Sequence, residues 1–197
     1  MLINNNNIKG TLLLPFLLLL ILCHFSACSF LVGYKKLKDI DKTSINSFCE
    51  KFKSTDCIVL DTGYLYRLKE FIKDSIEIKN FYQPLKVHYF VDGILKSNLI
   101  NCYAPGINKL NWNTENSLSE FPPKSHVQLK NEMSIDTFKK LINCNTALNG
   151  KNVVFIFWTN AFKKKSDDLV LTIKSSLGKK SIPYDLILVN GDFLFTQ

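Results

Sequence analysis

The chain of 197 residues is strongly basic but has almost no arginine. It carries 25 Lys and Arg residues against 17 Asp and Glu, and Arg67 is the only arginine. Lysine is a hydrated point charge, whereas arginine stacks on bases and binds phosphate through two parallel hydrogen bonds. The composition therefore argues against nucleic acid as a partner. It favours a solvated surface that could be attracted to anionic lipid headgroups, with runs such as Lys163–Lys165 and Lys179-Lys180 facing solvent.

The chain also lacks the short motifs that would identify a reaction. It has no Gly-x-Ser-x-Gly, no glycine-rich phosphate loop and no His-Glu-x-x-His. Outside the N-terminal region its histidines are His88 and His126, and neither has a Cys, Asp or Glu at metal-ligand spacing. We therefore predict neither a metal nor another cofactor. Asp61 and Asp192 are expected at the carboxyl ends of parallel strands, where sites in open α/β sheets usually lie, but the sequence pairs them with no partner.

No two cysteines form a Cys-x-x-Cys motif. Beyond the N-terminal region the cysteines are Cys49, Cys57, Cys102 and Cys144. Four thiols allow three sets of two disulfides, and the sequence does not choose among them. We expect most of them to be buried free thiols, because each lies within an apolar stretch. The chain is rich in Asn but has no Asn-x-Ser/Thr glycosylation site, which favours a bacterial context.

One long apolar run is present, Thr11–Cys23, and it follows ten residues whose only charge is Lys9. Phe25-Ser26-Ala27-Cys28 then resembles the lipobox of bacterial lipoproteins, with Phe25 where that family usually has Leu. The resemblance implies cleavage between Ala27 and Cys28 and a lipid on the Cys28 sulfur. It also implies a palmitate-type membrane anchor in the cell envelope.

Two other interpretations of this region stay open. A plain signal peptide would also use Ser26 and Ala27, and an uncleaved anchor would need about 20 apolar residues to span a bilayer. All three place the rest of the chain outside the cytosol. Ser29, rather than the Asp that retains many lipoproteins in the inner membrane, follows Cys28. The resemblance therefore favours the outer membrane, with the protein facing the periplasm.

These patterns divide the chain into a lipoprotein signal peptide over residues 1–27, a tether over 28–42 and a single α/β domain over 43–197. Apolar spacing and turn residues predict helices that start at Thr43 or Ser44, cover Tyr64–Lys73, run from Ser134 to Asn149-Gly150, and extend from Ser166 to Gly178. Strands are predicted at Cys57–Asp61, Val153–Trp158 and Tyr184–Asn190. Leu85–Val91 and Ile94–Ile100 read as a hairpin closed by Asp92-Gly93.

The crossover from Val153–Trp158 to Tyr184–Asp192 resembles the central β-α-β unit of thioredoxin-like proteins. In that family an apolar strand ends in Trp, the Cys-x-x-Cys follows, and the next strand ends in a sequence like Val-Asn-x-Asp. Here Thr159 and Phe162 stand where the two cysteines would be. The resemblance therefore implies a fold that has lost dithiol exchange, and Thr159 is expected to start a helix.

Gln83-Pro84 before the hairpin resembles the second half of the same family, where a proline precedes a hairpin beside the active site. In this chain the second half comes before the crossover. The predicted fold class is therefore α/β, a mixed sheet with helices on both faces in a thioredoxin-like or permuted thioredoxin-like sandwich.

We interpret the chain as a non-catalytic binding domain for an unknown envelope protein or small ligand. The alternative is an envelope thiol enzyme that uses Cys102 or Cys144. Asn101–His126 is predicted to be a long loop, and its aromatic residues Tyr103, Trp112 and Phe121 form a possible binding surface. Alternatively, its aromatic rings fold back over the sheet beside the hairpin.

Overall fold

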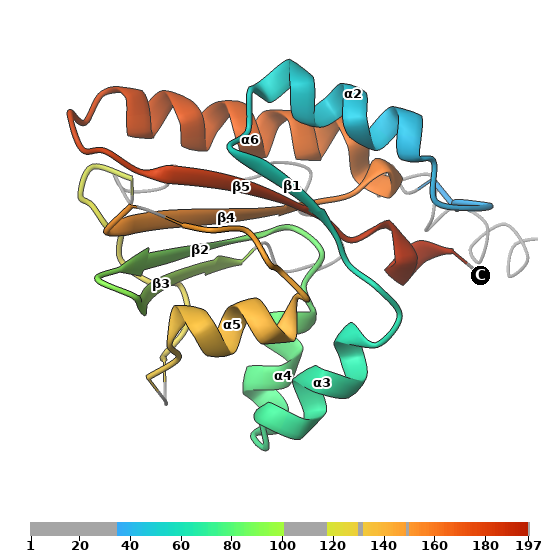
Figure 1. The fold of residues 1–197 in the computed structure, drawn as a ribbon, viewed down its shortest axis with the longest axis horizontal. Coiled ribbons are helices and arrows are strands. Elements are labelled where there is room, and N and C mark those ends of the chain that lie inside the picture. Colours follow the sequence, from blue (N-terminus) through green and yellow to red (C-terminus); the bar gives the residue numbers. More distant parts are fainter. Residues whose placement is uncertain (1–34, 101–117, 130–131, 149, 197) are drawn as a thin grey trace, which may run out of the picture. The chain divides into compact units, whose positions relative to one another are not determined.

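The computed structural model describes residues 35–100, 118–129, 132–148 and 150–196. The chain from Lys36 onward is one compact unit around a five-stranded sheet in the order β1-β5-β4-β2-β3 (Figure 1). Strands β1, β5 and β4 are parallel, and β2 is antiparallel to both β4 and β3. The strands are β1 (Asp56–Val59), β2 (Lys86–Val91), β3 (Ile94–Ile100), β4 (Asn152–Trp158) and β5 (Asp185–Asn190).

Helices cover both faces of this sheet (Figure 1). One face carries α2 (Lys42–Phe52) and α6 (Lys163–Gly178); the other carries α3 (Tyr64–Phe71), α4 (Ser75–Tyr82) and α5 (Ile135–Leu141). The predicted fold class is thus confirmed. The crossover β4-α6-β5 lies beside the hairpin β2-β3, but the hairpin comes first in the chain. This order is consistent with a permuted thioredoxin-like sandwich.

Among the helix starts, two differ from the sequence prediction. Helix α2 is capped by Asp41, whose carboxylate accepts hydrogen bonds from the backbone N–H groups of Thr43 (3.0 Å) and Ser44 (3.1 Å), so it starts earlier than predicted. Helix α6 starts at Lys163, not at Ser166, because the 3-10 turn η2 (Asn160–Phe162) leads directly into it. The first turn of α6 therefore holds lysines instead of the predicted aspartates.

Two further differences lie on the opposite face. Helix α5 ends at Leu141, well before Asn149-Gly150, because Asn143 takes a left-handed conformation with a φ of 53°. Helix α4 was not predicted at all. Its N-cap is Asp74, whose carboxylate accepts hydrogen bonds from the N–H groups of Ile76 (3.0 Å) and Glu77 (2.9 Å). The cap signal was present in the sequence, but a helix of 8 residues offers little periodicity to detect.

The predicted hairpin is confirmed. Asp92 and Gly93 both have positive φ, 48° and 77°, as a type I′ turn requires. Strand β3 is the edge of the sheet, and a neighbouring segment protects it: the N–H of His126 donates to the carbonyl of Asn98 over 3.0 Å, and Ser125 bonds to the same residue. The outer edge is thereby partly closed to pairing with another chain.

Strand β4 is buried on both faces, as its apolar sequence predicts. On one face the fully buried ring of Trp158 stacks on Phe48 of α2, with the ring centroids 3.7 Å apart. On the other, Phe138 of α5 packs against Phe155 at 4.9 Å and Phe90 at 5.1 Å. Truncating a buried aromatic ring of this kind costs about 3–5 kcal/mol. These two layers hold the carboxyl ends of β4 and β5 in place.

Candidate functional site

The carboxyl ends of β4 and β5 meet in a buried polar network centred on Asp192. This carboxylate accepts hydrogen bonds from the Thr159 hydroxyl (2.6 Å) and from the backbone N–H and the side-chain amide of Asn160 (2.7 Å each). Asp192 follows β5 in the 3-10 turn η3 (Asp192–Phe195), and Thr159 follows β4. The prediction that Asp192 lies at the end of a parallel strand is correct, and the structure supplies the partner that the sequence did not reveal.

Thr159 is fully buried, and its polar groups are all engaged. The hydroxyl donates to Asp192 and accepts from the N–H of Ala161 at 3.1 Å, so Thr159 starts a helical turn as predicted. Its backbone N–H and carbonyl both bond to the hydroxyl of Ser166, at 3.1 and 2.8 Å. In the thioredoxin resemblance this is the position of the first catalytic cysteine. Here it holds a buried hydroxyl group that already donates one hydrogen bond and accepts another.

The second cysteine position is filled by a ring. Phe162 is buried and packs edge to face against Phe195 of η3, with the ring centroids 5.5 Å apart. Pro84 is also buried and directly precedes β2, where Lys86 pairs with Phe157 of β4. Continuing this antiparallel register by two residues sets Pro84 level with Thr159, which matches the resemblance. The described groups at this edge pack and bond to one another, and none is a free nucleophile.

Asp61, at the end of β1, is held by a different set of groups. Its carboxylate contacts the guanidinium of Arg67 at 3.0 Å and accepts from the N–H of Gly63 at 2.7 Å and from the Asn143 amide at 3.3 Å. Burial alone would raise the pKa of Asp61. The hydrogen bond and positive charge of Arg67, together with the hydrogen bonds from Gly63 and Asn143, lower that pKa overall. Arg67 also donates from Nε to the carbonyl of Leu141 at 2.8 Å. This cluster ties α3 to α5.

Lys86 on β2 is fully buried, although polar residues that alternate with apolar ones in a strand normally face solvent. Its ammonium nitrogen lies 3.7 Å from the centre of the Phe157 ring and donates to the carbonyl of Gln83 at 2.6 Å. Burial lowers the pKa of Lys86 well below its usual value. Such an amine is nucleophilic, but this one is enclosed by the rings of Phe157 and Tyr64 and reaches no surface.

His88 lies two residues further along the same face of β2 and is also fully buried. Its ring packs among those of Phe81, Phe138 and Phe157 at 5.0 to 5.2 Å. Among the described residues neither ring nitrogen has a hydrogen-bond partner. Burial, and after it the nearby Lys86, lowers the pKa of His88 well below its usual value. No group of three His, Cys, Asp or Glu in the described part of the chain could hold a metal ion.

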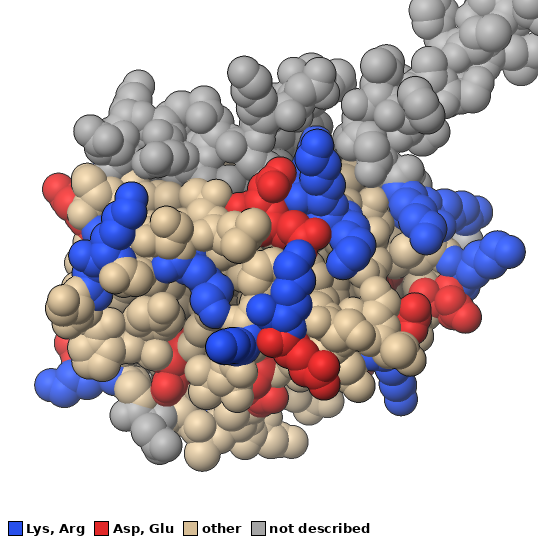
Figure 2. Space-filling model, turned by 90° about the horizontal axis from the view of Figure 1, so that it is seen from above, with Lys and Arg blue, Asp and Glu red and all other residues tan. Residues whose placement is uncertain are grey.

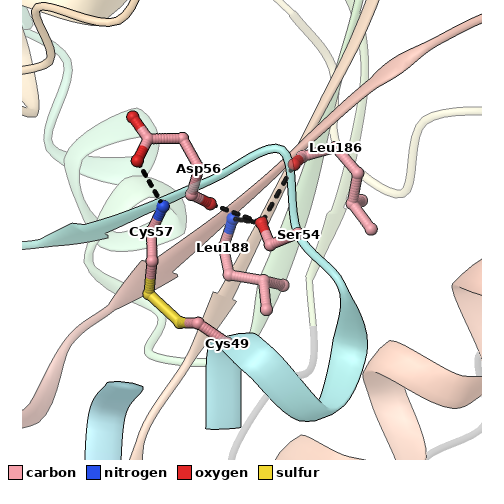
Figure 3. The surroundings of a disulfide bond; sticks show 6 residues. All are labelled: Cys49, Ser54, Asp56, Cys57, Leu186 and Leu188. Carbon is pink, nitrogen blue, oxygen red and sulfur yellow. Dashed lines mark hydrogen bonds between the residues drawn. A yellow bond between two sulfur atoms is a disulfide. The ribbon is translucent and has the colours of Figure 1, made fainter. Parts of the chain in front are cut away.

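Cys49 and Cys57 form a disulfide that joins the end of α2 to β1 (Figure 3). The expectation that most cysteines stay free is therefore wrong for these two. Apolar context did not separate a buried thiol from a bridged one, since the pairing depends on a turn that returns the chain to the sheet within 8 residues. Ser54 stabilises that turn: its hydroxyl donates to the carbonyl of Leu186 at 3.0 Å and accepts from the N–H of Leu188 at 3.2 Å (Figure 3).

Cys144 is free and buried, and Cys102 lies outside the described residues. Cys144 lines the inner wall of a surface hollow of about 500 Å³ whose rim includes Lys139 and Lys140. Neighbouring lysines are typical of reactive thiols, whereas burial is typical of inert ones. Cys144 has both features.

Of the predicted attachment and binding residues, the structure describes only Phe121. Cys28, Tyr103 and Trp112 lie outside the described residues. The half-buried Phe121 ring packs edge to face on Tyr89 of β2 at 5.9 Å, so it covers the sheet beside the hairpin. A hydroxyl-rich groove of about 590 Å³ lies between Leu118-Ser119 and the end of α6.

Comparison of the chain with protein-family models, curated proteins and solved structures gives no match. No helix in the described part of the chain is long and apolar enough to cross a membrane. The site must therefore be judged from its own chemistry: a satisfied polar network at the sheet edge, two enclosed basic side chains and a disulfide.

The sequence did not reveal Lys86 and His88 as core residues. Alternation with Val87 and Tyr89 normally marks a half-exposed strand. The helices on the polar-looking face bury the two basic side chains, with α3 beside Lys86 and with α4 and α5 beside His88. Detecting α4 from its Asp74 cap would have indicated that this face is covered.

Proposed function

We propose that the protein is a lipid-anchored domain of the bacterial cell envelope that acts by binding, without catalysis. The observation that carries this proposal is the state of Thr159, whose buried hydroxyl is committed to Asp192 and to the N–H of Ala161. With Phe162 packed at the second position, the sheet edge that serves catalysis in the resembled family is here a structural junction. The partner would be another envelope protein or a small ligand.

The Cys49–Cys57 disulfide supports export from the cytosol. Structural disulfides form and persist in oxidising compartments and are rare where glutathione and thioredoxin keep thiols reduced. This observation is independent of the N-terminal residues on which the lipobox resemblance depends. Together they favour an exported chain, cleaved before Cys28 and held by its lipid, and Ser29 favours the periplasmic face of the outer membrane.

The anchor is tested by replacing Cys28 with Ala in a bacterial host that processes lipoproteins. The wild-type protein should fractionate with membranes at a mass that shows cleavage and lipid, and the Cys28→Ala protein should not. Cys23→Ala is the matched control, since it removes a cysteine of the same apolar region and should leave the lipid in place. A Cys28→Ala protein that stays in the membrane with its leader attached would instead reveal a spanning anchor.

The rival function is a thiol enzyme using Cys144 or Cys102, and the lysines beside Cys144 are the observation that favours it. Alkylation of the folded full chain, read by mass spectrometry, separates the two proposals. For a binding domain, Cys144 should be labelled only after denaturation, because it is buried. Fast labelling of a single site in native buffer, lost in Cys144→Ala or Cys102→Ala, would favour the enzyme.

We place the contact surface for a partner on the loop that carries Tyr103 and Trp112. Phe121 is the part of this segment that packs on the sheet, and it marks where the loop returns to the core. Trp112→Ala should change the free energy of unfolding by less than about 1 kcal/mol if the ring is a contact residue. A loss of roughly 3–5 kcal/mol in a urea titration would show that the ring is core and would contradict a binding role for the loop.

A further inference from the structure

The beginning of the described chain docks on the sheet edge that carries the Asp192 network. Leu37 is buried; its N–H donates to the carbonyl of Phe195 at 3.3 Å, and it bridges to Thr196. A few residues later, the Ser44 hydroxyl donates to the side-chain oxygen of Asn160 at 3.0 Å. The segment leading from the N-terminus into α2 is thereby fixed against η2 and η3. The chain N-terminal to it must leave the domain from this edge.

Exposed lysines from two distant parts of the sequence gather at this edge. We call them the basic end: Lys36, Lys38, Lys42, Lys163 and Lys164. They come together because Ser44 bonds to Asn160 and because the Lys163 ammonium lies 5.1 Å from the ring of Phe48 in α2. From above, Lys and Arg side chains are spread over the face, and several lie, with acidic side chains between them, at the right-hand end, where Figure 1 shows the N-terminal segment and the C-terminal turn (Figure 2).

The basic end holds more lysines than there are acidic side chains beside it to balance their charge. Asp41 caps α2 through two hydrogen bonds, and Asp167 pairs with Lys51 at 2.7 Å. Neither the ion pair Lys51–Asp167 nor the ion pair Arg67–Asp61 includes a lysine of the basic end. Asp39 in the docked segment and the exposed Asp168 of α6 are the other nearby acids. The lysines thus leave an excess of positive charge pointing into solvent.

Helix stability does not explain the lysines at the start of α6. They occupy the N-terminal turn of a 16-residue helix, the positive end of its dipole, where acidic residues are favoured. Apart from the packing of Lys163 over Phe48, the described structure gives their exposed ammonium groups no stabilising contact. A charge cluster that weakens its own helix is better explained by an external anionic partner.

We propose that the basic end is a membrane-facing surface that binds the anionic phospholipid headgroups of the bilayer in which the Cys28 lipid is anchored. The proposal rests on the lipid anchor proposed above. Leu37 is the ninth residue after Cys28, and a fully extended chain of nine steps reaches only about 30 Å. The basic end therefore stays close to the headgroups. Its charge orients the domain with the hairpin turn at Asp92-Gly93 pointing away from the membrane.

Partition of the full-length protein between buffer and lipid vesicles tests this surface. The vesicles are phosphatidylcholine alone, or phosphatidylcholine with phosphatidylglycerol at about one third, and both are compared at low and high salt. Each lysine near an anionic surface contributes about five-fold to binding. The wild-type chain should prefer the anionic vesicles by more than ten-fold at low salt. This preference should disappear at about 0.5 M salt, where charges are screened over a few ångströms.

Lys163→Glu with Lys164→Glu should abolish the preference for phosphatidylglycerol. The fold should be retained, because glutamates suit the start of α6 better than lysines do, and a urea titration should show an unchanged or higher midpoint. Lys96→Glu with Lys179→Glu is the matched control: both side chains are exposed and remote from the basic end, and the change in net charge is the same. The control protein should keep most of the preference.

Equal binding of the wild-type chain to both vesicle types would overturn the basic end and leave the lipid anchor standing. A preference for anionic vesicles without binding to neutral ones would overturn the anchor and keep the basic end. If the control variant loses as much preference as the Lys163→Glu, Lys164→Glu variant, the effect is one of net charge and the assigned surface is wrong. If the Lys163→Glu, Lys164→Glu variant still prefers anionic vesicles, the assigned surface is also wrong.

Discussion

At the scale of single residues, Lys86 and His88 are the unusual feature of this core. The two basic side chains lie on the same face of β2, and both are fully buried. Lys86 donates a hydrogen bond to the carbonyl of Gln83, whereas the His88 ring has no hydrogen-bond partner among the described residues. Burying a charged group without a partner costs several kcal/mol, and burial lowers the pKa of both groups well below their usual values. Their protonation is therefore coupled to unfolding.

We predict that the stability of the protein falls in mild acid because of His88. The folded-state pKa of His88 lies well below the ordinary value of 6.5, so below that pH the unfolded chain binds a proton that the folded chain does not. The free energy of unfolding should fall as the pH decreases from about 6.5, with a slope that approaches about 1.4 kcal/mol per pH unit. Urea titrations at pH 7 and pH 5 measure this loss.

His88→Leu should remove the part of this loss that begins near pH 6.5, because leucine fills a similar volume and binds no proton. The matched control is His126→Gln, since His126 is exposed, and this variant should keep the wild-type slope. Identical losses in the wild-type and His88→Leu proteins would show that other groups cause the acid sensitivity. Lys86 acts in the same direction at higher pH: stability should rise toward its unfolded-state pKa of 10.5.

At the scale of elements, the disulfide and the Asp192 network fix the two ends of α2. The Cys49–Cys57 bond holds its C-terminal end to β1, and the bond from Ser44 to Asn160 holds its first turn to η2. Helix α2 in turn covers Trp158 through Phe48. These two attachments and the packing of Phe48 on Trp158 together fix how this helix lies on the sheet.

We predict that reduction of the Cys49–Cys57 disulfide lowers the free energy of unfolding by about 2–3 kcal/mol. The estimate comes from the entropy that the unfolded chain regains when a loop of this length opens, and the bridge spans 8 residues. Urea titrations of the wild-type protein with and without reductant measure it. The double variant Cys49→Ala, Cys57→Ala should not respond to reductant, and a response in that variant would point to another thiol.

Asp192→Asn should destabilise the protein by about 3 kcal/mol or more. The carboxylate accepts three hydrogen bonds in a buried position, and bonds to a charged group contribute about 1.5–3 kcal/mol each. An amide in its place would turn one acceptor into a donor that faces other donors. Asp168→Asn, at an exposed position of α6, should change stability by less than about 0.5 kcal/mol. An Asp192→Asn loss no larger than that of this control would contradict a structural role for the network.

The elements that the sequence predicts well are those whose signal is local. The hairpin is marked by Asp92-Gly93, and β4 is marked by an uninterrupted apolar run. The helix boundaries that differ from the prediction are set by capping groups and turns, which leave no mark in the apolar periodicity. The Ser166 hydroxyl bonds to the backbone of Thr159 instead of capping α6, and the helix starts before it. The spacing of apolar residues within α6 does not indicate this bond.

The candidate site divides in the same way. The position of Thr159 follows from the strand that ends in Trp158, and that of Asp192 follows from the end of β5. Their contact at 2.6 Å requires the register that sets Trp158 beside Asn190, which only the folded sheet supplies. The Cys49–Cys57 pairing likewise depends on a turn whose geometry the apolar context does not encode.

At the scale of the whole molecule, the chain is ordered so that its described ends meet. Leu37 bridges to Thr196 beside the carboxyl edge of the sheet, while the hairpin β2-β3 comes before the crossover β4-α6-β5 (Figure 1). Ends that lie together can be joined with little loss, because each doubling of loop length costs only about 0.6 kcal/mol. The order of the elements along the chain can therefore be changed without changing the sheet that they form.

We predict that a circularly permuted chain folds to the same sheet. Gln197 is joined to Lys36 by a short Gly-Ser linker, and the chain is opened within residues 101–117, a stretch with five Asn residues and the pair Pro105-Gly106. The crossover then precedes the hairpin, as in the resembled family. Far-ultraviolet circular dichroism should match that of the unpermuted segment 36–197, and one cooperative urea transition should remain.

Opening the chain between Val154 and Phe155 of the central strand should abolish that transition, because it breaks the buried pairing of β4 with both β2 and β5. Failure of the first permutant alone would show that the hairpin must be linked to α5 through residues 101–134 for the sheet to form.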